Sequence, residues 1–391
     1  MTTAQAERQG VWSTLVGQRP VIDALQQAAS GHGMTQSWLF TGPPGSGRSN
    51  AAIAFAAALQ CHHQGRGPDC PTQCHDCHTV LAGSHADVEI VRTQKLSLGV
   101  DDVRELVRRA ALTPVGDRWQ ILIVEDADRL TEQANNALLK AIEEPGSRTV
   151  WMLCAPTVED LLPTIRSRCR LVTLTTPTVP EVSAFLRRSL DVDDALATYA
   201  ARASQGHIGR AKALAGDEAT RNRRRDVVAI PAKLTSVGAC LRAAQQLVET
   251  AKEEADALTT TLDAREKADL DAAYGVVERG RRPREYAPAL GRLEKDQKTR
   301  AKRRQLDVID RGLMDLVTVY RDAITLATGA GAPLVNEEIR RDVETLAAHS
   351  TPELNLQRVA AIFGAREQLL EFNVTPALAV EAMMLALRDT R

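Results

Sequence analysis

Residues 37–49 read SWLFTGPPGSGRS, and this stretch decides the fold of the first part of the chain. The apolar run Ser37–Thr41 predicts a buried strand, and the apolar segment Ser49–Leu59 predicts a helix. The loop between them matches the phosphate-binding pattern G-x-x-x-x-G-K-[ST] at both glycines and at the final serine. In such loops backbone N–H groups surround phosphate oxygens. Strand, glycine-rich loop and helix in this order predict a nucleotide-binding fold.

One position of the loop departs from the pattern, because Arg48 stands where the lysine belongs. Arginine keeps the positive charge, but its planar fork is wider than an ammonium group and prefers bidentate pairing. The loop therefore predicts nucleotide contacts and casts doubt on efficient hydrolysis. The residues expected to contact nucleotide here are Gly42, Gly45, Gly47, Arg48 and Ser49.

Four further strands follow the first, separated by helical segments as far as about residue 175. Strands separated by crossover helices predict a parallel sheet with helices on both faces. Beyond Pro180 the strand signal stops. Residues 181–214 fit three short helices, and the rest of the chain is helical by composition and period, with one long helix over Lys302–Thr328. The predicted strands are Val88–Val91, Gln120–Val124, Val150–Cys154 and Arg170–Leu174.

Composition narrows the class of protein. The chain has 391 residues, a formal net charge of −1, 44% hydrophobic residues and only 3% aromatic residues. A neutral chain has no global basic field, so contact with nucleic acid would need a local patch. No apolar run is long enough for a membrane span, and residues 1–10 are polar without an apolar signal core. These features predict a soluble cytoplasmic protein that contacts no membrane.

Four of the seven cysteines lie close together, at Cys61, Cys70, Cys74 and Cys77. An odd total without a signal sequence argues for metal binding rather than a disulfide framework. Four thiolates predict a closed tetrahedral structural Zn²⁺ site in an insert at about residues 60–79. Four histidines lie among the cysteines and are alternative ligands: His62, His63, His75 and His78.

An acidic pair, Glu125 and Asp126, follows the third predicted strand. In P-loop ATPases this strand ends in the order Asp-Glu, where the Asp helps to hold Mg²⁺ and the Glu orients the attacking water. The reversed order displaces each carboxylate by about one methylene, and phosphoryl transfer depends on positioning. ATP and Mg²⁺ are therefore doubtful ligands at this chain's own site.

Three further motifs occur in a recognisable order, and with them the chain resembles the clamp-loader branch of the AAA+ ATPases. They are Gly17-Gln18, the segment Ala137–Lys140 with Glu143-Glu144-Pro145, and Ser167-Arg168-Cys169. The resemblance covers about residues 11–215. It implies an α/β AAA+ P-loop domain at 1–175, a three-helix lid at 176–218 and an all-α collar, or oligomerisation, domain at 219–391.

The resemblance also implies roles for individual residues. Arg168 matches an arginine finger that reaches the γ-phosphate held by a neighbouring subunit, and Arg210 matches the arginine of a lid-borne nucleotide sensor. The usual polar sensor after the fourth strand is replaced by Ala155-Pro156. Together with Arg48 and the Glu125-Asp126 order, this predicts a subunit that is by itself neither a polymerase nor an efficient ATPase.

The implied partners are gamma/tau and delta subunits in a pentameric hetero-oligomer, the sliding clamp, and primed DNA through the complex. Two alternatives remain open. One is a gamma/tau-type motor in which Arg48 supports genuine turnover, and the other is a zinc-stabilised DNA-binding scaffold. The stretch Arg279–Arg304 holds 11 basic and three acidic residues. Its single aromatic residue, Tyr286, favours a solvated helix pair over DNA contact.

Overall fold

The computed structural model describes residues 10–63, 70, 74–92, 97–276, 283–372 and 374–388. The chain divides into two compact units, Met1–Gly216 and Asp217–Arg391, and each is considered by itself. The division into three domains stays a prediction. No helix within these described ranges is both long and apolar enough to cross a membrane.

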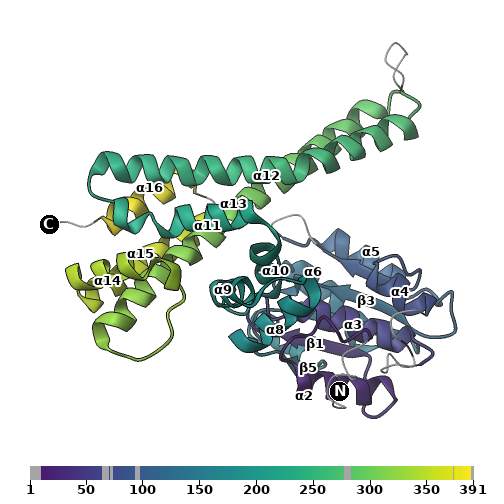
Figure 1. The fold of residues 1–391 in the computed structure, drawn as a ribbon. Helices are drawn as coiled ribbons and strands as arrows, with labels where there is room; N and C mark the ends of the chain where they lie inside the picture. The colour runs from purple at the N-terminus through teal and green to yellow at the C-terminus, as the bar shows by residue number, and fades with distance from the viewer. Residues whose placement is uncertain are drawn as a thin grey trace. The chain divides into compact units, whose positions relative to one another are not determined.

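The first unit contains a five-stranded parallel sheet in the order β2-β3-β4-β1-β5 (Figure 1). This arrangement confirms the predicted α/β fold. Strands β4 and β5 differ from the predicted spans by a residue at their ends. The bounds are β1 (Ser37–Thr41), β2 (Val88–Val91), β3 (Gln120–Val124), β4 (Thr149–Ala155) and β5 (Arg170–Thr173).

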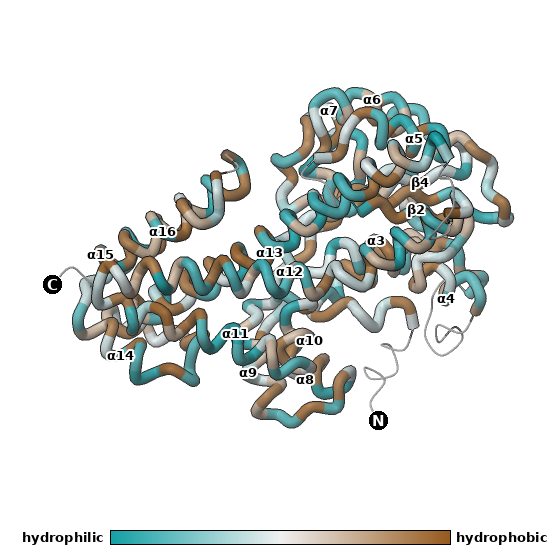
Figure 2. The backbone as a smooth tube through the Cα atoms, turned by 90° about the horizontal axis from the view of Figure 1, so that it is seen from above, coloured by the Kyte–Doolittle hydropathy of each residue, from teal (hydrophilic) through white to brown (hydrophobic). Residues whose placement is uncertain are grey.

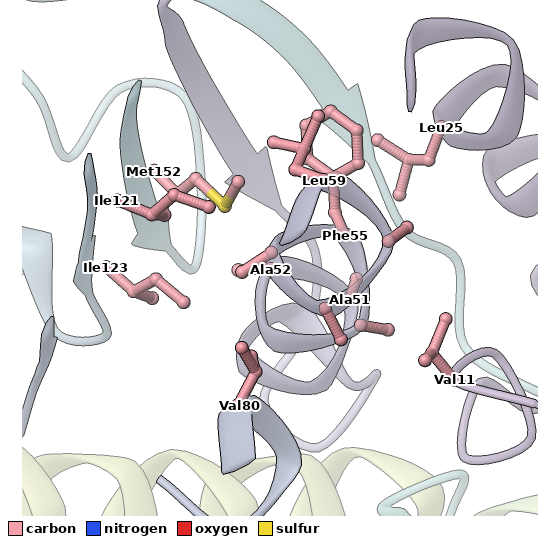
Figure 3. Packing of buried hydrophobic residues seen from close by; sticks show 14 of the residues in the cluster. Val11, Leu25, Ala51, Ala52, Phe55, Leu59, Val80, Ile121, Ile123 and Met152 are labelled. Carbon is pink, nitrogen blue, oxygen red and sulfur yellow. The ribbon is translucent and has the colours of Figure 1, made fainter. Parts of the chain in front are cut away.

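Helices cover both faces of the sheet, as the crossover pattern predicts. On one face Ile123 of β3 lies toward the helix after the phosphate loop (Figure 3), and Phe40 of β1 belongs to the same hydrophobic cluster. On the other face Leu39 and Leu122, their sequence neighbours, pack with the helices around β3. Side chains alternate in this way because successive residues of a strand point to opposite faces. The helices are α2 (Arg19–Ala29), α3 (Arg48–Gln60) and α4 (His75–Leu81) on the first face, and α5 (Val100–Ala110), α6 (Glu132–Glu143) and α7 (Pro163–Arg166) on the second.

Helix α3 has mainly alanine side chains where it packs against the sheet. Ala51, Ala52, Ala54, Ala56, Ala57 and Ala58 are fully buried, and Phe55 packs edge-on against Trp38 with ring centroids 4.8 Å apart. Small side chains let the helix backbone approach the strands closely. The helix start is therefore held at a defined distance from the end of β1.

Three helices complete the first unit: α8 (Val179–Leu190), α9 (Asp194–Ser204) and α10 (Ile208–Gly216). They enclose a hydrophobic cluster of their own, to which Phe185, Leu186 and Ile208 contribute. At the start of α8 the backbone N–H of Thr178 donates to Glu181 at 2.9 Å, which satisfies one of the unpaired groups at the helix end.

The second unit is entirely helical within the part of the chain that the structure describes. Its core includes Ile309, Leu313, Leu316 and Tyr320, as the periodicity of the long helix predicts. That helix is longer than predicted, because it begins at Tyr286. The tube in Figure 2 changes between hydrophilic and hydrophobic colours along α12 and α13, as expected for amphipathic helices. The helices are α11 (Glu218–Val228), α12 (Val237–Ala273), α13 (Tyr286–Thr328), α14 (Arg340–His349), α15 (Pro352–Leu370) and α16 (Pro376–Leu387), with short 3-10 turns at Pro231–Lys233 and Glu337–Ile339.

A buried polar network ties α13 to the segment before α14. Asp322 is fully buried and accepts hydrogen bonds from the backbone N–H groups of Val335 at 3.0 Å and Asn336 at 2.7 Å. The side-chain amide of Asn336 donates to Asp322 and to the hydroxyl of Thr318, each at 2.9 Å. These donors have no access to water and depend on the carboxylate.

We expect Asp322→Ala to lower the free energy of unfolding by about 3–5 kcal/mol, because it leaves several buried donors unpaired. Chemical denaturation followed by circular dichroism measures the loss. Asp310→Ala is the matched control: it removes a carboxylate from the same helix, but one whose pair with Arg366 is partly exposed. The control should lose less than about 1 kcal/mol. Equal losses in the two variants would contradict the importance of the network.

Candidate functional site

Three segments predicted to form the nucleotide site meet at one edge of the sheet. The phosphate loop follows β1, Glu125 follows β3, and Pro156 follows β4. The register aligns Thr41 with Ala155 and Val124 with Leu153, so the carboxyl ends of these strands lie together. The backbone N–H of Gly42 donates to the carbonyl of Pro156 at 3.1 Å and joins the loop to the end of β4.

The loop has the backbone that a phosphate cradle requires. Gly42, Gly45 and Gly47 have φ values of +149°, +81° and +98°, which other residues rarely adopt. A Cβ on Gly42 would lie 2.6 Å from the carbonyl oxygen of Leu174. Gly47 precedes the first turn of α3, so the positive end of the helix points toward the cradle.

Arg48 uses its guanidinium within the loop itself. Its Nη1 donates to the carbonyl oxygen of Gly42, at the start of the same loop. Burial lowers the pKa of Arg48, and the nearby carboxylates of Asp128 and Asp126 oppose that shift. Nucleotide binding through this side chain requires the internal hydrogen bond to break.

Cys154 lies beside the phosphate loop although it belongs to none of the predicted motifs. It is fully buried at the end of β4, and the Ser49 side chain forms a hydrogen bond with it. Burial raises the pKa of the Cys154 thiol, so this group is neutral beside the loop. The following residue, Ala155, is buried and has no polar side chain, as predicted. Only the strand register could reveal the position of Cys154.

Glu125 is paired with a basic residue from the neighbouring strand end. Nε of Arg92 lies 2.9 Å from Oε2 of Glu125. Burial raises the pKa of Glu125, and Arg92 opposes the shift; Oε1 is buried without a hydrogen-bond partner. Asp126 lies 3.9 Å from Arg129 in the 3-10 turn Ala127–Arg129. Arg92 was not predicted, because its place beside Glu125 depends on the pairing of β2 with β3.

The start of α10 contacts the phosphate loop. The backbone N–H of Ile208 donates to the carbonyl of Gly45 at 3.2 Å. A Cβ on Gly45 would lie 2.2 Å from Cγ of His207, so the imidazole lies directly against this glycine. Nδ1 of His207 accepts from the backbone N–H of Arg210 at 3.2 Å, which places Arg210 in the first turn of the same helix. The contact brings the predicted sensor helix to the loop.

Arg168 lies outside this group of residues. Its Nη2 is 2.8 Å from Oε1 of Glu143, and its Nη1 donates to the carbonyl of Thr164 at 2.8 Å. The Arg168 side chain is 40% exposed. Two of the predicted motifs, Glu143-Glu144-Pro145 and Ser167-Arg168-Cys169, are therefore joined by one partly exposed ion pair.

The four clustered cysteines come together as their spacing predicts. The Sγ atoms of Cys61 and Cys70 are 3.2 Å apart, those of Cys70 and Cys77 3.6 Å, and those of Cys61 and Cys74 3.9 Å. All four sulfurs lie within 4.8 Å of one another. Metal–sulfur bonds of about 2.3 Å in a tetrahedron place sulfurs about 3.8 Å apart. The cluster therefore has the dimensions of a closed four-thiolate site.

Backbone groups support this cluster. The N–H of Cys77 donates to Sγ of Cys74, and the N–H of His63 donates to Sγ of Cys61, each at 3.3 Å. Such N–H donors stabilise thiolate ligands. Burial raises the pKa of Cys70 to about 11 and raises the pKa of Cys77 as well. Metal binding must therefore displace protons, and the affinity should rise with pH.

The sequence is similar to those of DNA polymerase III subunits. The model of the protein family described as "DNA polymerase III, delta subunit" matches residues 17–178. The delta' subunit of DNA polymerase III from Escherichia coli is 34% identical over 193 residues, which cover 49% of this chain and 57% of that protein. The delta' subunit from Haemophilus influenzae is 39% identical over 134 residues, which cover 34% of this chain and 40% of that protein.

A second kind of DNA polymerase III subunit is also similar to this chain. The DNA polymerase III subunit gamma/tau of Mycobacterium tuberculosis strain H37Rv is 33% identical over 162 residues, which cover 41% of this chain and 28% of that protein. The chain thus spans between about a quarter and somewhat more than half of the length of these relatives. The residues that the family model matches, 17–178, include all five strands of the sheet.

We expect the purified chain to carry about one divalent metal ion, and the double variant Cys74→Ser/Cys77→Ser to carry almost none. Elemental analysis of the dialysed protein measures the content. A chelator should remove the metal more readily at pH 6 than at pH 8, because protons compete for the thiolates. Cys169→Ser, which changes a cysteine outside the cluster, should keep the metal. Equal metal content in the double variant and the wild type would exclude this site.

Proposed function

We propose that this chain, which belongs through residues 17–178 to the clamp-loader family of DNA polymerase III, serves in that assembly as the delta-prime subunit. In this role it is a stator, a subunit that holds the ring's geometry without hydrolysing ATP. Its partners are the gamma/tau and delta subunits, the sliding clamp, and primed DNA through the complex. The assembly uses ATP to load the clamp on primed DNA during replication.

The observation that carries the proposal is the Arg92–Glu125 ion pair at the expected magnesium position. A carboxylate that pairs with Arg92 at 2.9 Å is already neutralised, and Mg²⁺ would have to displace the guanidinium to bind there. The reversed Glu125-Asp126 order adds a displacement of about one methylene. These residues do not fit a catalytic Mg²⁺ site.

The phosphate cradle supports the same conclusion. The guanidinium of Arg48 is bonded to the carbonyl of Gly42, and the His207 ring lies against Gly45. A nucleotide must displace both groups before its phosphates reach the loop amides. ATP is therefore a weak ligand or none at this site, although the glycine backbone of the loop is intact.

Arg168 is the residue that we assign to catalysis, in the active site of a neighbouring subunit. It is partly exposed, and Glu143 holds it at the surface through one ion pair. A partly exposed pair of this kind is weak, so the guanidinium can exchange Glu143 for a γ-phosphate. An arginine finger supplied from outside stabilises the charge of the transition state.

The second candidate is a gamma/tau-type motor with genuine ATPase activity. Two observations favour it: the 33% identity to gamma/tau and the preserved positive-φ glycines of the loop. We prefer the stator because three positions of one site, Arg48, Glu125 and Ala155, depart from the pattern of active P-loop ATPases. The motor would require Arg48 to turn toward a bound nucleotide.

We assign the cysteine cluster to one structural zinc ion, held by Cys61, Cys70, Cys74 and Cys77. Four thiolates leave no open coordination position, so the ion would fold the insert and take no part in catalysis. Its binding free energy would be on the order of 10 kcal/mol and would add to the packing of Cys70, Cys77 and Val80 in the core of the first unit.

We expect Arg168→Ala to lower the clamp-dependent ATPase rate of the reconstituted assembly by about 10³-fold at the site that receives Arg168. Single-turnover hydrolysis measures this rate. Arg166→Ala, two residues earlier, is the matched control and should hydrolyse ATP at the wild-type rate. Circular dichroism should show both variants folded. A rate unchanged in the Arg168 variant would remove its assigned role.

We expect the isolated chain to show no measurable ATP hydrolysis, because Glu125 is paired with Arg92, and Arg48 and His207 lie against the phosphate loop. Release of inorganic phosphate measures turnover, and equilibrium dialysis with labelled ATP measures binding. Hydrolysis on the order of 1 s⁻¹ that is abolished by Arg48→Ala would instead support the motor.

A further inference from the structure

Helices α12 and α13 form a paired arm that continues beyond the core of the second unit (Figure 1). The core uses α12 as far as Ala251 and α13 from Leu306 onward. Beyond these points the two helices contact mainly each other. We call residues 249–273 and 286–304 the arm.

The interior of the arm is held together by polar contacts. Arg300 is largely buried and pairs with Glu266, with Nη1 2.8 Å from Oε1, and with Asp263. The amide of Gln297 donates to the carbonyl of Asp263 at 3.1 Å, and the hydroxyl of Tyr286 donates to Asp271 at 2.5 Å. These contacts fix the register of the two helices.

The two sides of the arm carry opposite charge. Residues 249–273 of α12 include eight acidic and three basic residues, whereas residues 286–304 of α13 include seven basic and two acidic residues. The near-neutral net charge of the whole chain hides this separation. The arm therefore presents a basic side and an acidic side.

The basic side is organised as a stripe, which we define as Arg292, Lys295, Lys298 and Lys302. Spacings of three, three and four residues place them on one face of the helix, and all four are exposed. Three of them line a shallow surface groove of about 360 Å³, together with Gly291, Glu294 and Thr299.

Most of this stripe is not neutralised by the protein. Within the described residues, Arg292, Lys295 and Lys298 take part in no ion pair, whereas Arg300 and Arg311 on the same helix pair with acidic residues of α12. Glu294 borders the groove and removes part of its positive charge. The three cations outside any ion pair face solvent along about 9 Å of helix.

We propose that the basic stripe binds the sugar-phosphate backbone of duplex DNA. A row of cations about 15 Å long matches a backbone that carries one negative charge per about 1.7 Å of duplex axis. The scarcity of aromatic side chains, which from the sequence alone favoured a solvated helix pair, disfavours only a single-strand site, because stacking platforms are not needed for phosphate contacts with a duplex. The acidic side, α12, repels phosphates, so the duplex contacts one side of the arm only. The stripe lies outside residues 17–178, and the proposal does not depend on the nucleotide site or on Arg168.

The test uses the full chain and a fluorescently labelled duplex at several salt concentrations, with anisotropy as the readout. We expect Arg292→Gln/Lys295→Gln/Lys298→Gln to weaken binding by on the order of tenfold at low salt. The slope of log affinity against log salt should fall by about 2–3, because each lost phosphate contact removes nearly one unit. The matched control, Lys252→Gln/Arg265→Gln/Lys267→Gln, removes the same charge from α12 and should bind like wild type.

Other outcomes distinguish the alternatives. Equal DNA affinity in the two triple variants overturns the proposal, as does tighter binding of a single strand than of the duplex. Loss of self-association in the stripe variant, with DNA binding unchanged, would instead assign the stripe to the acidic side of a second copy. Arg168→Ala should keep wild-type DNA affinity. The ATPase measurement therefore tests the stator role, and the DNA-binding measurement tests the stripe independently. Circular dichroism and thermal unfolding establish that each triple variant is folded.

Discussion

The close packing of strand β1 and helix α3 is the constraint on which the first unit depends. Strand β1 pairs with β4 on one side and β5 on the other, and α3 approaches it through a face of buried alanines. The chain between them must turn tightly, and only positive-φ glycines allow it to do so. The same turn aims the amides of the loop and the start of α3 at one point, so the fold and the phosphate cradle have a common origin.

The charged side chains of this site, and Arg168 outside it, already have partners within the protein. The guanidinium of Arg48 bonds to the carbonyl of Gly42, Glu125 pairs with Arg92, and Arg168 pairs with Glu143. Arg48 and the Glu125 carboxylate are partly buried, so a group that replaces their partners must be desolvated, although the Arg92 side chain is itself 65% exposed. The third pair is partly exposed and can be exchanged at little cost. In the proposed role, the buried Glu125 carboxylate disfavours magnesium at this site, whereas the partly exposed Arg168 would be available to a neighbouring subunit.

Much of the fold was predictable because it depends on local signals. The apolar runs predicted all five strands, and the spacing of Cys61, Cys70, Cys74 and Cys77 predicted a cluster that the structure brings within 4.8 Å. The positions of Arg92, Cys154 and His207 were not predictable in this way. Each reaches the candidate site through strand pairing or the return of α10, and nothing near them in the chain indicates this position. The length of α13 was also underestimated, because its charged first half has little hydrophobic period.

The sequence alone determined which segments become strands, where the chain must turn, and which sulfurs can share a metal ion, because backbone conformation and ligand type are properties of neighbouring residues. Only the tertiary structure decided how the charges are used. It paired Glu125 with Arg92, laid His207 on Gly45, and left Arg292, Lys295 and Lys298 facing solvent while Arg300 was buried among acids. Electrostatic interactions depend on distance and burial in space, and residues far apart in the chain set both.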